Sequence, residues 1–219
     1  MKTMGCDIHV HVEYKKSLFT GYDADNKPQY ESKWICGDYF HKNPYFGSDE
    51  YEKEWSLVGL CDSRNYAMFS ILANVRNYGN TEYIDEPRGL PEDVTEMVKE
   101  DAENWGIDGH SHSYLTLKEL IDFQNKQTPL RHRGMISPEQ QKDLDEKGLV
   151  PDSWCQGTNI PGYEFREWET KNEVLLPMIE ALKTRADELY FIYRFSWDCN
   201  YEECYQKAEN IRIVFWFDN

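Results

Sequence analysis

The chain has 219 residues, which is enough for one large domain or two small ones with a substantial hydrophobic core. Its formal net charge of −16 repels DNA, RNA and anionic membranes, which excludes them as partners but leaves room for a small anion in a local basic pocket. No apolar run is long enough to span a bilayer, and the six cysteines follow no secretory leader, so we expect a cytoplasmic protein with reduced thiols.

The N-terminal part of the chain predicts a β-hairpin. An amphipathic strand over about residues 5–15 carries Ile8 and Val10 on its apolar face. A turn-forming cluster at 22–28 separates this strand from a second extended segment at about 29–36.

The middle of the chain predicts helices, each bounded by a capping residue, a turn or a glycine. They run from Asp62 or Ser63 to just before Gly79, from the turn at 87–93 to near Trp105, from Thr116 to about Asn125, from Ser137 to Gly148, and over about 171–187.

Two aromatic runs near the C-terminus, 189–197 and 211–217, are typical of paired antiparallel strands. Strands thus occupy both ends of the chain with helices between them, and no alternating strand–helix rhythm is present. The sequence therefore predicts an α+β fold as a single domain over 1–219. Its antiparallel sheet is built from the N- and C-terminal strands, with the helices inserted between.

Two His-x-His doublets are the most distinctive motif. His9 and His11 lie in the first strand, and His110 and His112 lie in a short loop or strand just before a helix start. Residues i and i+2 of a strand face the same side, so each doublet places two imidazoles on one surface, about 6.5–7 Å apart along the backbone. Such a surface suits a metal ion, a phosphate or another polar ligand. A structural role for both doublets also stays open.

One basic island interrupts the acidic sequence, at Lys126, Arg131, His132 and Arg133. It has two interpretations: a solvated loop, which we favour in the absence of a motif, or a mobile loop that contacts an anionic ligand.

Several sequence blocks resemble one family. They are Met4–His9, Arg64–Tyr66, Pro87–Pro91, Asp108–Thr116 and Val214–Asp218, and they look like a family of small cytoplasmic proteins of tailed phages and prophages. The resemblance spans nearly the whole chain and implies a phage accessory protein that acts against host defence. It brings no catalytic residue set, so catalytic residues stay unknown.

A second, shorter resemblance covers Asp7-Ile8-His9-Val10-His11, which is similar to the first motif of the polymerase and histidinol phosphatase phosphoesterases. It implies metal ligation by His9 and His11, with Asp7 orienting an imidazole. That family has further ligands on later strands of a barrel, whereas only His41 and His132 remain outside the doublets here.

We favour a binding protein that sequesters a small anionic, nucleotide-type ligand such as a host-defence second messenger, without a cofactor. Cationic or donor side chains would hold its phosphates, and aromatic side chains would stack on its base. The candidate ligand-binding residues are His9, His11, Arg64, Tyr66, Arg88, Trp105, His110, His112 and Tyr114. We expect Arg88, His110 and His112 to contribute to one pocket, unless Arg88 pairs with a nearby acid such as Glu92.

The alternative is an enzyme, a metal-dependent phosphoesterase or nucleotide hydrolase. Its divalent metal would be held by Asp7, His9, His11, Asp108, His110 and His112 if the two doublets converge. The sequence carries no Walker loop, dinucleotide fingerprint, nucleophile elbow or HExxH helix, which leaves the common nucleotide-hydrolase, dehydrogenase and hydrolase classes without support. Homo-oligomerisation stays open in both interpretations.

Overall fold

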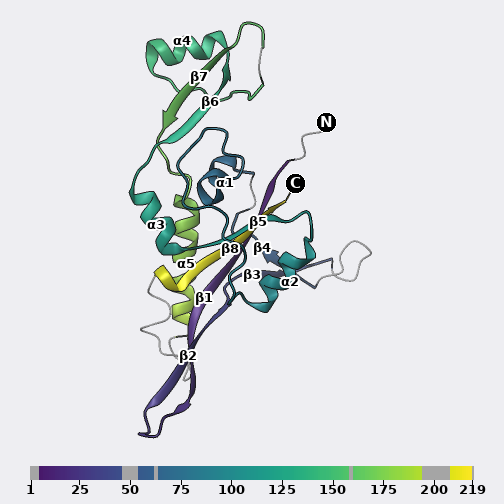
Figure 1. Ribbon diagram of the computed structural model, residues 1–219, viewed down its shortest axis with the longest axis vertical. Coiled ribbons are helices and arrows are strands. Elements are labelled where there is room, and N and C mark those ends of the chain that lie inside the picture. Colours follow the sequence, from purple (N-terminus) through teal and green to yellow (C-terminus); the bar gives the residue numbers. More distant parts are fainter. Residues whose placement is uncertain (1–4, 46–53, 62–63, 158–159, 194–207, 219) are drawn as a thin grey trace. The chain divides into compact units, whose positions relative to one another are not determined.

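The computed structural model describes residues 5–45, 54–61, 64–157, 160–193 and 208–218 (Figure 1). The elements follow one another as β1 (Asp7–Tyr22), β2 (Pro28–Cys36), β3 (Tyr39–Lys42), β4 (Trp55–Val58), α1 (Tyr66–Ala73), α2 (Glu96–Asn104), β5 (His110–Thr116), α3 (Leu117–Asn125), β6 (Leu130–Ile136), α4 (Pro138–Lys147), β7 (Glu164–Thr170), α5 (Leu176–Tyr193), a 3₁₀ turn (Ala208–Asn210) and β8 (Ile211–Asp218). None of the helices in the described ranges is both long enough and apolar enough to cross a membrane.

The main sheet confirms the predicted α+β class. It has the strand order β2-β1-β8-β5, and every neighbouring pair in it is antiparallel (Figure 1). The first and last strands pair directly, with His9 opposite Trp216 and Tyr14 opposite Ile211. The remaining strands of the described ranges form two two-stranded antiparallel sheets, β3-β4 and β6-β7, which the sequence patterns did not predict.

Strand β8 occupies the centre of the main sheet because it is apolar on both faces. All of its residues from Ile211 to Phe217 are buried. On one face, Trp216 and Val214 pack against Val98 and Ala102 of α2. A strand that is covered on both faces usually has a nearly continuous run of hydrophobic residues in its sequence, and this segment has such a run.

Contacts divide the chain into two compact units. Unit 1 comprises residues 1–64, 87–122 and 176–219, and unit 2 comprises residues 65–86 and 123–175. The assignment of 1–219 to a single domain stays a prediction.

The strand predicted at 189–197 is wrong over its first five residues. Its first five residues continue α5 to Tyr193, and residues 194–197 lie outside the described residues. The helix buries Met178, Ile179, Leu182 and Ala186 at helical spacing, and extending an existing helix costs far less than nucleating a new element. The strand prediction for 211–217 is confirmed.

Several predicted boundaries also move. Helix α1 is capped by Asn65, whose side chain accepts from the N–H of Met68, and it ends at Asn74 in the left-handed conformation rather than near Gly79. The proposed caps Asp62 and Ser63 lie outside the described residues. Helix α2 begins only at Glu96, and α5 begins at Leu176 rather than near 171. The predicted helix between Ser137 and Gly148 is confirmed, with a complete capping box.

Candidate functional site

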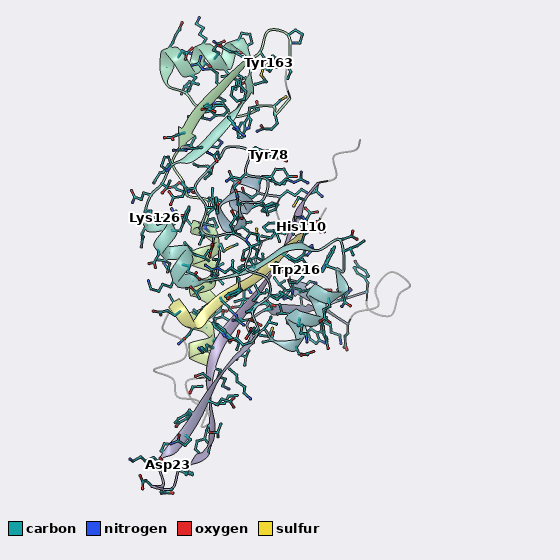
Figure 2. All side chains as sticks on the ribbon, in the orientation of Figure 1. Asp23, Tyr78, His110, Lys126, Tyr163 and Trp216 are labelled. Atoms are coloured by element: carbon teal, nitrogen blue, oxygen red, sulfur yellow. The ribbon has the colours of Figure 1, made fainter. Side chains whose placement is uncertain are left out.

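Three of the four doublet imidazoles surround one indole in unit 1. The ring centroid of Trp216 lies 5.7 Å from His9, 5.3 Å from His11 and 5.7 Å from His112, each at an interplanar angle of 23°. Trp216 stands on the central strand β8, between the strands that carry the doublets; Figure 2 labels it together with His110. His9, His11 and His112 therefore approach one fully buried indole on the same face of the sheet.

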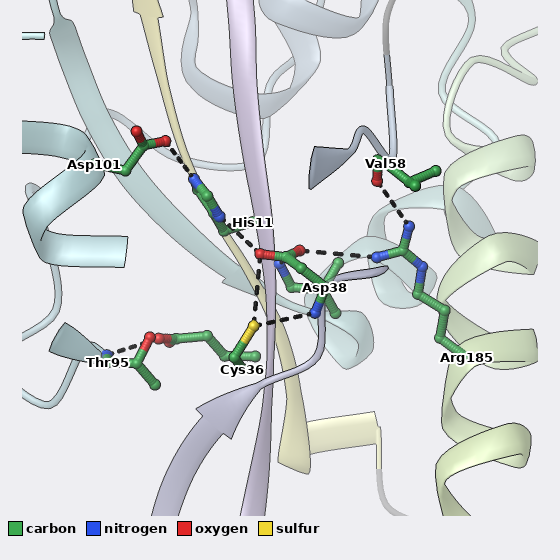
Figure 3. Close-up of polar contacts among 9 residues, drawn as sticks. His11, Cys36, Asp38, Val58, Thr95, Asp101 and Arg185 are labelled. Atoms are coloured by element: carbon green, nitrogen blue, oxygen red, sulfur yellow. Dashed lines mark hydrogen bonds and ion pairs between the residues drawn. The ribbon is translucent and has the colours of Figure 1, made fainter. Parts of the chain in front are cut away.

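His11 is bound on both ring nitrogens by carboxylates (Figure 3). Its Nδ1 lies 2.7 Å from Asp38, and its Nε2 lies 3.0 Å from Asp101 of α2. Burial by itself lowers the pKa of this imidazole, but the hydrogen bonds to Asp101 and Asp38 outweigh it and raise the pKa to about 9. His11 is thus a protonated link between the sheet and α2 at neutral pH.

Asp38 holds this link from the side of the β2-β3 connection. It accepts from the backbone N–H of Val12 at 2.8 Å, and Arg185 of α5 lies 3.8 Å away (Figure 3). The side chains of Asp38 and Arg185 are 1% and 6% exposed. The group joins β1, α2 and α5 through the buried side chains of His11, Asp38 and Arg185, while Asp101 is partly exposed, and this arrangement suits a structural role better than ligand exchange.

His9 also has its polar partner inside the protein. Its Nε2 lies 3.2 Å from Asp218, and its ring lies 4.0 Å from the ring of Trp105. The neighbouring carboxylate of Asp7 accepts from Arg64, with one contact of 2.8 Å, and this ion pair lowers the pKa of Asp7. His9 and Trp105, both predicted site residues, therefore meet, whereas Arg64 is engaged by Asp7.

The second doublet does not present a common face, contrary to prediction. The pairing of β5 with β8 shifts register between His110 and Ser113, and Ser111 adopts a positive φ of 52°. His110 consequently stacks on Phe217 while His112 stacks on Trp216, and adjacent residues of a strand face opposite sides. A β-bulge of this kind breaks the i, i+2 rule.

The side chain of Arg88 has partners within the same unit of the protein. Its guanidinium donates to Glu119 at 2.6 Å and to the carbonyl of Tyr114 at 3.2 Å, and it lies over the ring of Tyr114. The acid that pairs with Arg88 is therefore Glu119, not Glu92. The backbone N–H of Arg88 donates to the hydroxyl of Ser113, next to the second doublet. The shared pocket of Arg88, His110 and His112 stays a prediction.

The residues of the proposed metal set have other partners or positions. Asp7 pairs with Arg64, the first two histidines pair with aspartates, and His110 Nδ1 lies 3.0 Å from the hydroxyl of Ser111. Within the described ranges, no group of three or more histidine, cysteine or carboxylate side chains is arranged to hold a metal ion.

Unit 2 contains a different site, which we call the arginine pocket. It has a volume of about 230 Å³ and is lined by Tyr66, Ala67, Ser70, Arg76, Tyr78, Gly79, Thr81, Leu130, Arg131, His132, Arg133, Trp154 and Gln156. Three of these residues are arginines, four are aromatic or imidazole side chains, and none is acidic. Arg131, His132 and Arg133 of the basic island thus belong to strand β6 and line the pocket, so the favoured interpretation of a solvated loop is wrong for these three residues. Lys126 directly follows α3 and does not line the pocket.

One wall of the arginine pocket is the loop after α1, which its own asparagine organises. The side chain of Asn77 accepts from the N–H of Thr81 at 2.8 Å and donates to the carbonyl of Thr81 at 2.8 Å. Arg76 and Asn80 adopt positive φ angles of 53° and 52°. An arginine in this conformation is uncommon, and such positions cluster at functional sites.

The loop is fastened to β6 at two points. The hydroxyl of Thr81 donates to the carbonyl of Arg131 at 3.2 Å and accepts from the N–H of the same residue at 3.3 Å. A methyl group at Gly79 would stand only 2.1 Å from that carbonyl oxygen, so only glycine permits the approach. This close contact brings Arg76 and Tyr78 beside the arginines of β6.

His132 and Trp154 give the pocket an aromatic part of its lining, and Trp168 supports His132 from outside the lining. The ring of His132 stacks on Trp168 at 5.5 Å and meets Trp154 edge-on at 5.1 Å. Burial lowers the pKa of His132, and its Nε2 lies 2.8 Å from the hydroxyl of Thr170. Gly134 makes room for Trp154, because a methyl group there would stand 2.6 Å from the indole.

The three arginines differ in their partners. Arg131 pairs with Glu169 of β7 at 3.2 Å, with both side chains more than half exposed, and Arg76 donates to the hydroxyl of Tyr78 at 3.2 Å. Arg133 is half-buried, and no residue in the described part of the chain forms a hydrogen bond or an ion pair with its guanidinium. A half-buried cation without a carboxylate is unusual in a chain with 40 acidic residues.

The predictions found this pocket only in part. Tyr66 was predicted as a ligand residue, and the basic island was recognised, but Arg76, Tyr78 and Trp154 were missed. The turn-forming run Arg76-Asn77-Tyr78-Gly79-Asn80 was a usable signal, because it places an arginine and a tyrosine in a tight loop.

Comparisons with protein families, with curated proteins and with solved structures find no match to this chain.

Proposed function

We propose that the protein binds a small anionic, nucleotide-type ligand in the arginine pocket of unit 2. The observation that carries this proposal is the composition of the lining, which has three arginines and no acidic residue although acidic residues outnumber basic ones by 40 to 24 in the chain. A local positive field in a strongly negative protein selects small anions over polyanions, which the rest of the surface repels.

Arg133 is the first candidate to hold a phosphate, because no carboxylate among the described residues pairs with its guanidinium and would compete with the phosphate for it. Planar guanidinium groups bind phosphate oxygens in pairs of parallel hydrogen bonds. Tyr66, Tyr78 and Trp154 supply aromatic faces and edges in the same lining, as stacking of a base requires. The pocket therefore offers both parts of nucleotide recognition.

The size of the pocket limits how such a ligand fits. Its volume of about 230 Å³ lies below the roughly 300–1,000 Å³ of typical small-molecule sites. A neighbouring hollow of about 380 Å³ shares Gly79, Arg131, His132 and Arg133 with it, and it also contains Glu167 and Glu169. We expect the phosphate near Arg76 and Arg133, because Arg131 is paired with Glu169. We expect only the part of the ligand that the arginine pocket cannot hold to reach the second hollow.

We further propose that binding serves sequestration. The resemblance to phage accessory proteins supports this role, because a protein that withdraws a host-defence messenger needs a complementary pocket and no catalytic set. The metal-dependent hydrolase remains the alternative, and the same experiment separates the two.

The test is to incubate the purified protein with a panel of cyclic and ADP-ribose-type nucleotides and to measure what remains free in solution. The protein is then denatured by heat and the released nucleotide is analysed. We expect depletion of at least one nucleotide followed by recovery of the intact molecule. A cleaved product would replace sequestration by hydrolysis, and the absence of depletion across the panel would reject nucleotide binding.

Two variants tie the result to the pocket. Arg133→Gln removes the guanidinium without a described partner, and Lys171→Gln removes the same charge from a side chain that is 82% exposed in the same unit. Depletion should fail with Arg133→Gln and persist with Lys171→Gln. Equal losses in both variants would indicate a general effect of net charge.

A further inference from the structure

Unit 2 contains a second, wider hollow, which we call the acidic groove. It lies between α4 and the segment 149–155, with Tyr163 at its border, and has a volume of about 770 Å³ (Figure 2 labels Tyr163). Its lining contains acidic side chains and no lysine or arginine. In charge it is the opposite of the arginine pocket.

The groove exposes large apolar side chains. Leu149, Val150, Trp154 and Tyr163 are 54%, 51%, 41% and 42% exposed. All four line this one hollow. Contiguous apolar side chains with a polar rim mark sites of interaction with other proteins or ligands, whereas single exposed apolar residues do not.

Helix α4 forms the other side and is itself poorly covered, since none of its residues is buried. Its start is held by the Ser137 capping box and by the side chain of Gln140, which donates to Asp152 at 3.0 Å and to the carbonyl of Ser153 at 2.9 Å. A helix in a folded protein normally obtains most of its stability by packing an apolar face. Here the hydrogen bonds fix the walls of the groove while its inner surface stays uncovered.

Two acids give the rim its charge. Glu139 forms no ion pair with any residue in the described ranges, and Asp152 accepts only from the neutral groups of Gln140 and Ser153. Asp143, the third, pairs with Lys147 at 2.6 Å. Glu139 and Asp152 thus place negative charge without an ion pair among the described residues beside apolar side chains, although Lys147 of the same helix lies within the Coulombic reach of Glu139.

We propose that the acidic groove binds a basic, aliphatic segment of another protein. Charge complementarity selects this occupant. A second copy of the chain brings a net charge of −16 and is repelled, and an anionic membrane surface is repelled by the same rim. A peptide segment with lysine or arginine beside leucine or valine matches both the rim and the floor.

The experiment uses two labelled peptides of equal length and charge, one alternating lysine with leucine and the other alternating lysine with serine. Fluorescence anisotropy measures their affinity for the intact protein at physiological salt. We expect the lysine–leucine peptide to bind at least about tenfold more tightly, because apolar burial adds to the charge attraction. Equal affinities would overturn the proposal, since only non-specific attraction by the net charge would remain.

Matched variants locate the binding. The double change Leu149→Ser with Val150→Ser removes the apolar floor without altering charge, and Ile107→Ser is its control, because Ile107 is fully exposed in unit 1. Glu139→Gln is paired with Glu103→Gln on the exposed surface of α2. The affinity for the lysine–leucine peptide should fall about tenfold in the Leu149→Ser/Val150→Ser protein and about threefold in Glu139→Gln. In the two control variants the affinity should stay within about twofold of the wild type.

All of the changed side chains are exposed, and the circular dichroism and melting temperature should stay unchanged. Equal weakening in the groove variants and their controls would overturn the assignment to the groove. A concentration-dependent dimer that disappears in the Leu149→Ser/Val150→Ser protein would replace the proposed partner by a second copy. Binding to phosphatidylserine vesicles that is lost in the same variant would replace it by a membrane.

Discussion

The guanidinium of Arg212 in the last strand donates to the carboxylate of Glu13 in the first strand at 2.7 Å, and both side chains are buried. The two residues are also opposite each other in the register of β1 and β8. The same carboxylate accepts from the backbone N–H of Thr95 at 2.7 Å, at the start of α2, where no side chain of the helix itself provides a cap (Figure 3). One ion pair thus joins both ends of the chain and caps a helix from outside.

Glu13→Gln should destabilise the protein by about 2–4 kcal/mol, because it leaves the buried guanidinium of Arg212 short of charge compensation. Asp93 is the matched control, since it contacts the same guanidinium at 2.7 Å with a side chain that is 63% exposed. Asp93→Asn should cost less than about 1 kcal/mol. Urea unfolding of both variants measures the difference, and equal losses would refute the special role of the buried partner.

The link at His11 predicts a pH dependence of stability. Its folded pKa of about 9 lies above the unfolded value of 6.5, so the stabilisation is fully present below pH 6.5 and is lost as the pH rises through about 9. The loss should amount to about 3 kcal/mol at most between these limits. The measurement is the free energy of unfolding in urea from pH 6 to pH 10 for the wild type and for His11→Gln. The gap between the two curves should narrow with rising pH, and parallel curves would contradict the protonated link.

Arg133→Gln should separate binding from stability. If Arg133 forms a charge-assisted hydrogen bond to a ligand phosphate, its loss should cost about 1.5–3 kcal/mol, which is roughly a tenfold to hundredfold weaker affinity. The ligand-free variant should melt no lower than the wild type, because the guanidinium has no partner among the described residues and lies in a pocket with two other arginines. Isothermal titration and thermal melting test both statements. A lower melting temperature without ligand would point to a structural role.

The geometry of the arginine pocket should depend on one hydroxyl group. Thr81→Val replaces it with a methyl group and leaves the carbonyl and N–H of Arg131 without their side-chain partner, at an expected cost of about 1–3 kcal/mol. Thr81→Ser keeps the hydroxyl and should retain most of the stability and the ligand affinity. If serine and valine behave alike, the fastening of the loop to β6 does not depend on this hydrogen bond.

The protein as purified should carry no stoichiometric zinc or manganese, because His9 and His11 are bonded to carboxylates that hold them in the fold. Elemental analysis of the purified chain measures this directly, and chelation should leave the melting temperature unchanged. One or more equivalents of metal that disappear in the His9→Ala/His11→Ala protein would favour the metal-dependent phosphoesterase instead.

The sequence by itself determined the parts that depend on local pattern. Alternation in the first strand, the apolar run at 211–217 and the cap at Ser137 predicted β1, β8 and α4, and strands at both ends predicted the antiparallel α+β class. These features are set within a few residues by side-chain spacing and backbone hydrogen bonding. The strand prediction for the aromatic run at 189–193 was wrong, because the preceding helix continues through these residues and tertiary packing overrides their β-propensity.

The tertiary structure alone decided the roles of the charged residues. The sequence shows which histidines and arginines exist, but the partner of each lies far along the chain: Asp101 for His11, Asp218 for His9 and Glu119 for Arg88. Only Arg133 kept a guanidinium without a partner among the described residues. Whether a charge is available to a ligand depends on which opposite charge the fold places within hydrogen-bond distance, and sequence spacing does not encode that distance.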